Sequence, residues 1–192
     1  WPKTDHRKKD SNVLPSTQKI SRLIFLITLT LIFQMLGLPP VFTGPIINMM
    51  LILTSLVISP VAACILGVLT PIVAALRGQL PGFMLPMIPF IMIANSVLIL
   101  LFTAFRTFFA KWLQNDNILL SIPAWLGLII GSFFKFLLLY YAARVLLPLF
   151  LGIDLRDVVI RAMSLPQFFT ALAGGTLAFI IFKMLQSRFF FK

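Results

Sequence analysis

Residues 44–96 read GPIINMMLILTSLVISPVAACILGVLTPIVAALRGQLPGFMLPMIPFIMIANS, a long apolar run that decides the fold of the chain. Its only ionisable side chains are Cys64 and Arg77, and six prolines divide it. Proline is favoured in the first turn of a helix and disrupts a helix interior. The run therefore predicts two short apolar helices back to back, a loop and the start of a third helix. Because water would not solvate such a surface, we expect these helices to lie in a lipid bilayer.

The whole chain has the composition of an integral membrane protein. Of its 192 residues, 60% are hydrophobic and 11% are charged, whereas charged residues make up about 25% of a soluble domain. A spanning helix needs about 20 apolar residues, and the apolar runs here are continuous rather than alternating as in a transmembrane β-strand. We therefore expect an all-α integral membrane protein with six transmembrane helices, in which residues 1–18 are a polar cytoplasmic tail and residues 19–188 form the membrane domain.

The six expected spans follow from the apolar runs and their proline breaks. They are residues 19–38, 43–58, 60–76, 85–105, 119–147 and 164–185. Lys and Arg concentrate in the N-terminal tail, in the loop after the fourth span and at the C-terminus. Because short cytoplasmic loops carry an excess of Lys and Arg, both termini are predicted to be cytoplasmic in a cell membrane. The segment LGIDLRDVVIRAM, residues 151–163, is expected to form a short interfacial helix on the outer face.

The net charge of +11 is explained by membrane topology and contact with lipid headgroups, so a nucleic-acid partner is not expected. The single histidine, His6, lies in the polar tail, and the chain has one cysteine. No His/Cys metal site or other cofactor site is therefore expected. All five acidic residues fall in tails or loops, and there is no Walker lysine motif. An enzyme that catalyses hydrolysis within the membrane is accordingly disfavoured, and so is a protein that binds ATP itself.

Polar side chains at membrane depth are costly, and they are the best candidates for function. Lys135 lies in the fifth span, about 18 Å from its outer end at a rise of ~1.5 Å per residue. By the same count Asn95 lies about 15 Å below the outer end of the fourth span. The two helices run antiparallel, so the side chains are predicted at similar depth. They would form a ligand site, with Lys135 as cationic donor and Asn95 as hydrogen-bond partner, or else a polar contact that only fixes helix packing.

Four other polar residues are candidates to join this site. They are Gln34 near the outer end of the first span, Gln167 at the outer start of the sixth, Asn48 in the second span, and Arg77 in an outer loop. A role at a helix end or at the headgroups is the alternative for each of them. Small residues four apart, such as Ala63/Gly67, Gly127/Gly131 and Ala171/Gly175, predict close helix packing rather than a partner-binding seam.

The run of residues 44–96 and the lysine in KFLLLYY resemble the substrate-binding S components of energy-coupling factor (ECF) vitamin transporters. The resemblance implies six helices with cytoplasmic termini, and an outward-open pocket for a vitamin-like small molecule closed by the loops after spans one, three and five. It makes Asn95, Lys135 and the Arg77 loop candidate ligand contacts. It also implies three partners, a transmembrane coupling subunit and two cytoplasmic ATPases, with the S component toppling in the bilayer to release its ligand.

The first span, RLIFLITLTLIFQML, departs from the family pattern because it lacks the alanine-xxx-alanine motif on which the coupling subunit docks in many S components. Docking would then use Thr28 or the small residues of the third span. Two other functions are alternatives to a transport subunit. One is a structural or scaffold protein of the cell envelope without a small-molecule ligand. The other is a membrane enzyme or lipid carrier, which the missing acidic groups disfavour.

Overall fold

The computed structural model describes residues 16–80, 82–110, 119, 121–152 and 157–189, and every regular element in these ranges is helical. In chain order the elements are α1 (Ser16–Met35), α2 (Pro40–Val57), α3 (Pro60–Leu76), the 3₁₀-helix η2 (Gly82–Met87), α4 (Ile88–Ala110), α5 (Ile122–Tyr141), the π-helical turn η4 (Ala142–Leu146), α6 (Leu147–Leu151), α7 (Asp157–Ala162) and α8 (Leu165–Phe189). The predicted all-α class is therefore confirmed.

Among the described residues, five helical stretches are long and apolar enough to cross a membrane. They are Thr17–Met35, Pro40–Val57, Gly82–Phe109, Ile122–Leu149 and Ile160–Gln186. The remaining predicted span, the third, corresponds to α3, which is apolar but has only 17 residues. The fold is thus a bundle of five to six membrane-crossing helices, close to the six that the sequence predicts.

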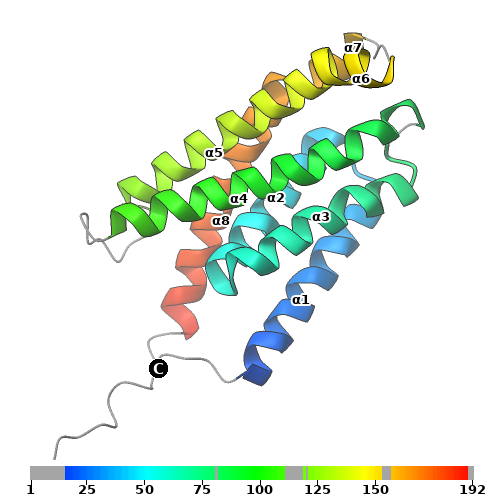
Figure 1. Cartoon of the computed structure of the whole chain (residues 1–192). Helices are drawn as coiled ribbons and strands as arrows, with labels where there is room; N and C mark the ends of the chain where they lie inside the picture. Colours follow the sequence, from blue (N-terminus) through cyan, green and yellow to red (C-terminus); the bar gives the residue numbers. More distant parts are fainter. Residues whose placement is uncertain (1–15, 81, 111–118, 120, 153–156, 190–192) are drawn as a thin grey trace, which may run out of the picture.

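The helices are arranged so that α1 begins and α8 ends at the same end of the bundle, while α6 and α7 lie at the opposite end (Figure 1). We call the first end the basic end, because Lys19 and Arg22 lie in the first two turns of α1 and Lys183 lies in the last two turns of α8. Of the predicted tail, residues 1–15 lie outside the described residues and residues 16–18 already belong to α1.

Prolines and one serine place the ends of α2 and α3. Pro39 is the N-cap of α2 and Pro40 its first residue, so α2 begins three residues before the predicted span. Two residues separate α2 from α3, and the Ser59 hydroxyl accepts a hydrogen bond from the Ala62 amide at 3.2 Å. This serine cap satisfies one of the orphan amides at the start of α3. The predicted tight hairpin between the second and third spans is confirmed.

Two spans differ in detail from the sequence prediction. The fourth span starts with the 3₁₀-helix η2, because Pro86 and Pro89 remove the amide donors that an α-helical start would use. The fifth span passes through the π-helical turn η4 and continues in α6 to the left-handed C-cap Gly152. The predicted interfacial segment contains the short helix α7, and residues 153–156 of it lie outside the described residues.

Glycines let α4 and α5 touch along their backbones, as the predicted small-residue pattern requires. A Cβ on Gly127 would lie 2.9 Å from the Phe102 carbonyl oxygen, and one on Gly131 would lie 2.9 Å from the Leu98 carbonyl oxygen. Helix α4 also packs on α3, while α8 packs on α2 and α5. This arrangement brings the middle of α2, α4 and α5 together in the interior.

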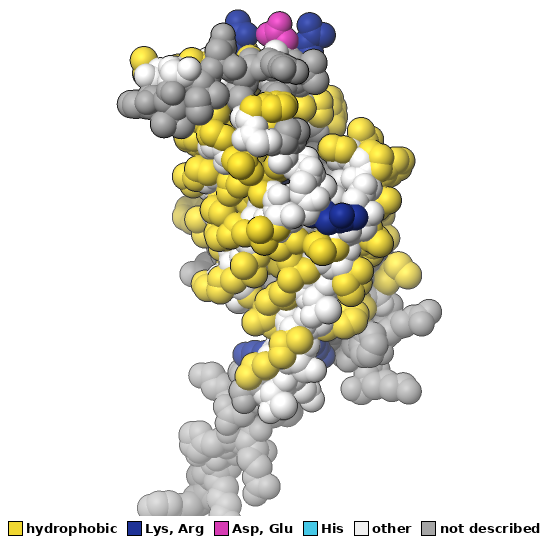
Figure 2. All heavy atoms as spheres, turned by 90° about the vertical axis from the view of Figure 1, so that its right-hand side faces the viewer, with side chains coloured by type: hydrophobic (Ala, Val, Ile, Leu, Met, Phe, Trp, Pro, Cys, Tyr) yellow, Lys and Arg dark blue, Asp and Glu magenta, His cyan; other side chains and the backbone are white. Residues whose placement is uncertain are grey.

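The outside of the bundle is suited to lipid rather than water. Figure 2 shows a face covered mainly by hydrophobic side chains, with Lys, Arg and acidic side chains at its upper end. Many large apolar residues are exposed, among them Val41 at 72%, Val61 at 70% and Phe108 at 73%. Exposed apolar surface of this extent is typical of a membrane-spanning protein.

Candidate functional site

The Lys135 ammonium group lies between two asparagine side chains in the interior of the bundle. Its Nζ donates to the Asn95 Oδ1 at 2.7 Å and to the Asn48 Oδ1 at 2.6 Å. The three residues come from α5, α4 and α2, and each is at most 4% exposed. We call these residues the Lys135 cluster. The predicted meeting of Lys135 and Asn95 is confirmed, and Asn48 joins them.

A proline in α3 positions Asn95. In a regular helix the Gly67 carbonyl would accept from the amide four residues later, but that residue is Pro71, which has no N–H. The Asn95 Nδ2 donates to this carbonyl at 2.9 Å. Because a carbonyl can only accept, the contact fixes the orientation of the amide and turns the Asn95 Oδ1 toward the lysine.

Asn48 is oriented by the same logic within its own helix. Its Nδ2 donates to the Gly44 carbonyl at 2.9 Å, one turn earlier in α2, so its Oδ1 is left to accept from Lys135. A Cβ on Gly174 of α8 would lie 2.4 Å from the Pro45 carbonyl oxygen and 2.7 Å from the Asn48 Cβ. The close approach of α8 therefore holds Asn48 from behind.

Backbone packing also sets the register of Lys135. Gly131 contacts Leu98 across the α4–α5 interface. Lys135 follows Gly131 by one helical turn, and Asn95 precedes Leu98 by about one turn. Because the two helices run antiparallel, these steps lead to the same level of the bundle. The glycine contact thus places the lysine opposite the asparagine.

Lys135 is the one ionisable residue of the cluster, and no carboxylate of the described residues lies near it. Of the five acidic residues, only Asp157 is among the described ones, and it is exposed in α7. An ammonium group has three donors, and two of them have acceptors among the residues that the structure describes. The Ser132 hydroxyl, one turn earlier on α5, is buried and has no hydrogen-bond partner in the described part of the chain. The site can therefore supply further hydrogen bonds to an anion or a carbonyl.

Gln34 and Arg77 form a separate group that joins the end of α1 to the segment after α3. Gln34 Nε2 donates to the Gln79 Oε1, and Gln79 Nε2 donates to the Gln34 carbonyl at 3.1 Å. Arg77 Nε donates to the Met35 carbonyl at 3.0 Å. These donors satisfy carbonyls of the last turn of α1, which have no partner within the helix. Neither Gln34 nor Arg77 has a hydrogen bond to the Lys135 cluster within the described ranges.

Gln167 stands apart from both groups. It lies in the first turn of α8 and its Nε2 donates to the Ala162 carbonyl at 3.2 Å. This contact is local, since Ala162 ends α7 just before α8 begins. Within the described residues, Gln167 is not brought to Lys135.

Sequence reasoning did not find Gln79, Ser132 or Gly174, whereas it did predict close packing at Gly67, where an added Cβ would lie 3.0 Å from the Asn95 Cβ. A glycine followed by a proline four residues later, as in Gly67 and Pro71, was the available signal for a carbonyl without its usual helical amide donor. In the structure this carbonyl accepts from the Asn95 side chain at 2.9 Å and from the Thr70 hydroxyl at 3.4 Å. No sequence signal marks Gln79, because its importance comes from its position opposite the end of α1. In the described ranges no group of three or more His, Cys, Asp or Glu side chains could hold a metal ion.

Comparison of the chain with known protein families, with curated proteins and with solved structures found no match to any of them.

Proposed function

We propose that the chain is the membrane-embedded substrate-binding subunit of an importer, which captures a water-soluble vitamin or vitamin precursor from outside. The observation that carries the proposal is the Lys135 ammonium, buried in a membrane-crossing bundle and held between Asn48 and Asn95. Charged groups inside a membrane protein are costly, and they commonly mark a substrate path.

The charge of the site supports a substrate with an anionic or carbonyl-rich group. A buried cation without a counter-ion is stabilised when a carboxylate or phosphate oxygen accepts one of its hydrogen bonds. The Ser132 hydroxyl, which has no hydrogen-bond partner among the described residues, offers a second polar contact on the same helix. Both groups would be satisfied by one polar ligand.

The proposal extends to partners through the resemblance to ECF S components. A transmembrane coupling subunit and two cytoplasmic ATPases would drive release of the substrate, since this chain has no Walker lysine motif. Copurification of the tagged chain with these subunits tests this part. Recovery of the chain alone from its native membrane, in a mild detergent, would contradict it.

The substrate is tested with the purified full chain. Small molecules released by denaturation are identified by mass spectrometry, and the hits are titrated back. Lys135→Met removes a charge-assisted hydrogen bond of about 1.5–3 kcal/mol, so affinity is expected to fall about tenfold to a hundredfold. Lys183→Met, which changes an exposed lysine of α8, is the matched control and should bind normally. Unchanged affinity in the Lys135 variant would refute its assigned role.

A scaffold protein of the cell envelope is the second candidate, and one observation favours it. Both asparagine amides already use their oxygen and nitrogen within the protein, as a purely structural polar contact would. This function predicts that no small molecule is released from the purified chain, and that a panel of vitamins and phosphorylated precursors causes no thermal shift. A stoichiometric bound vitamin would exclude it.

A further inference from the structure

A cleft of about 430 Å³ opens between α1, α2 and α8 at the basic end of the bundle. Arg22 and Phe25 of α1, Leu53 and Val57 of α2, and Phe182 and Gln186 of α8 contribute to its walls. Helix α1 packs on α2 and α3, while α8 packs on α2 and α5, so α2 forms the floor between α1 and α8. The volume lies within the range of about 300–1,000 Å³ found for small-molecule sites.

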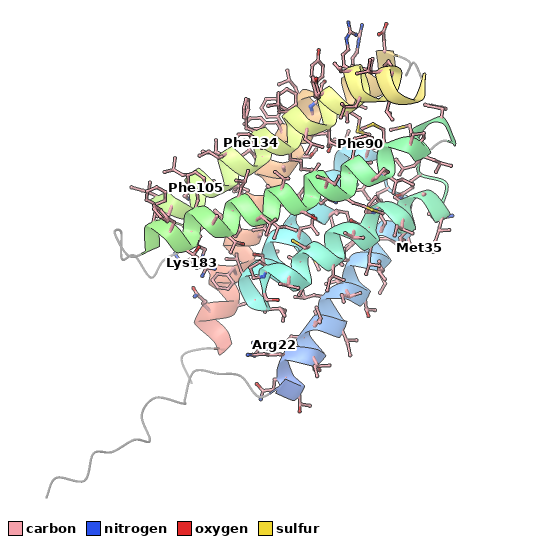
Figure 3. The ribbon with its side chains drawn as sticks, viewed as in Figure 1. Arg22, Met35, Phe90, Phe105, Phe134 and Lys183 are labelled. Atoms are coloured by element: carbon pink, nitrogen blue, oxygen red, sulfur yellow. The ribbon has the colours of Figure 1, made fainter. Side chains whose placement is uncertain are left out.

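The lining of the cleft has an apolar part and a polar part, as a phospholipid has acyl chains and a headgroup. Most of its residues are aliphatic or aromatic, which suits an acyl chain, and the polar side chains are Arg22 and Gln186. Figure 3 shows the Arg22 side chain extending from the lower part of α1 toward α8, with Lys183 above it on α8. The exposed Lys19 and Lys183 add positive charge to this end of the bundle.

The charge also determines which kind of lipid fits. Lys and Arg mark the cytoplasmic side of a membrane protein, and the cytoplasmic leaflet carries anionic lipids that basic side chains attract. Basic pockets between transmembrane helices on this side are typical headgroup sites. A zwitterionic lipid would fill the apolar walls equally well but would gain less from the guanidinium group.

We propose that this cleft binds one anionic phospholipid, with an acyl chain against Phe25, Leu53 and Phe182 and its phosphate at Arg22. The site is separate from the Lys135 cluster and does not depend on the function proposed above. A lipid in the cleft would fill the space between α1 and α8 at the basic end, where these two helices are not packed along each other.

The test uses the full chain in a neutral detergent and native mass spectrometry. The protein is titrated with dioleoyl phosphatidylglycerol and, separately, with dioleoyl phosphatidylcholine, which has the same chains. We expect the anionic lipid to bind more tightly, by about the fivefold that one basic side chain near a membrane surface contributes. Arg22→Gln should remove this difference by weakening the binding of phosphatidylglycerol more than that of phosphatidylcholine. Glycerol 3-phosphate, which has the headgroup phosphate without chains, should not compete.

Two pairs of variants locate the site. Lys19→Gln removes a neighbouring charge that does not line the cleft, and it should keep the preference that Arg22→Gln loses. Val57→Trp fills the cleft and should reduce binding of both lipids, whereas Val61→Trp, at an exposed position of α3, should not. Equal losses in the two charge variants would overturn the proposal in favour of diffuse attraction. An unchanged Val57→Trp variant would overturn it as well, as would crosslinking of a partner protein's helix to the cleft in native membranes.

Discussion

At the scale of single residues, the centre of the bundle depends on backbone groups that the sequence leaves without their usual partners. Pro71 frees the Gly67 carbonyl, which orients Asn95, and Asn95 in turn accepts from Lys135. Pro71 of α3 thus helps to place Lys135 of α5, although among the described residues Lys135 has no direct hydrogen bond to α3. The same residues would serve a ligand site or a structural contact. In both cases the coupling energy between Lys135 and its asparagine partners measures how strongly the residues interact.

A double-mutant cycle on Lys135 and Asn48 measures that coupling. Lys135→Met leaves the two amide oxygens without their donor, which costs about 1–3 kcal/mol for a buried orphan group. Asn48→Leu keeps the branching and the Cβ position of the side chain, so the close contact with Gly174 is retained. We expect the double variant to be less destabilised than the sum of the single variants by about 1 kcal/mol, within the range for directly bonded pairs.

The measurement is the free energy of unfolding in mixed micelles of a mild detergent and a denaturing one. Ser96→Ala with Lys135→Met is the control cycle, because the Ser96 hydroxyl bonds the Met92 carbonyl of its own helix. Additive effects in both cycles, to within about 0.5 kcal/mol, would contradict the coupling between Lys135 and Asn48.

A glycine substitution tests the close approach of α8 to α2. Gly174→Ala would place a Cβ 2.4 Å from the Pro45 carbonyl oxygen, so the two helices must separate. We expect a loss of about 1–3 kcal/mol or more in the free energy of unfolding, as for other overpacked sites. Gly82→Ala is the matched control, because no atom lies within 4 Å of its added Cβ. Equal stability of the two variants would refute the packing.

The sequence predicted part of this site for a clear physical reason. Lys135 and Asn95 lie on helices of opposite direction, so counting residues from the outer ends gives their relative depth. Asn48 was only a candidate, because depth does not give the rotation of α2 about its axis. For Gln34 and Arg77 the prediction of ligand contact remains untested. In the structure Gln34 donates to the Gln79 side chain and Arg77 donates to the Met35 carbonyl, so both join α1 to the segment after α3.

At the scale of elements, the positions of prolines explain where the helix boundaries predicted from the sequence agree with the structure and where they differ from it. The proline break at Pro60 predicted the start of α3 closely, because proline marks a helix start, whereas α2 begins at Pro40, three residues before the predicted span. The 3₁₀ start of the fourth span and the π-helical turn after α5 were not predicted. Pro86 and Pro89 disfavour a regular α-helical start, but composition and periodicity do not distinguish a 3₁₀ or π-helical turn from an α-helical one.

The link between α1 and the segment after α3 is tested by two glutamine variants. Gln79→Ala removes both hydrogen bonds of the pair, whereas Gln34→Ala leaves the bond from Gln79 to the Gln34 backbone carbonyl in place. We therefore expect amide hydrogen exchange in the last turn of α1 to be fastest in Gln79→Ala and intermediate in Gln34→Ala. Gln167→Ala, which breaks only a local bond to Ala162, should leave α1 unchanged. The reverse order for the two glutamines would contradict this geometry.

At the scale of the whole molecule, the path of the chain brings the start of α1 and the end of α8 to one side of the bundle. Helix α1 begins and α8 ends at the basic end, as expected for a chain that crosses the membrane an even number of times (Figure 1). The 17 residues of α3 rise about 26 Å, nearly the ~30 Å of a hydrocarbon core. Its shortness is therefore compatible with a sixth crossing, and the even count depends on it.

Cysteine labelling in intact cells decides the topology. With Cys64→Ala as background, single cysteines are placed at Gln18 and Lys183 of the basic end and at Gly82 and Asp157 of the opposite end, all exposed. Because Lys and Arg mark the cytoplasmic side, a membrane-impermeant maleimide should label only the cysteines at positions 82 and 157, and lysis should expose the other two. Labelling of position 82 together with position 18 would mean that α3 does not cross. Labelling of positions 18 and 183 alone would mean that the bundle has the opposite orientation, in which the lipid cleft faces outward and the end with α6 and α7 faces the cytoplasm.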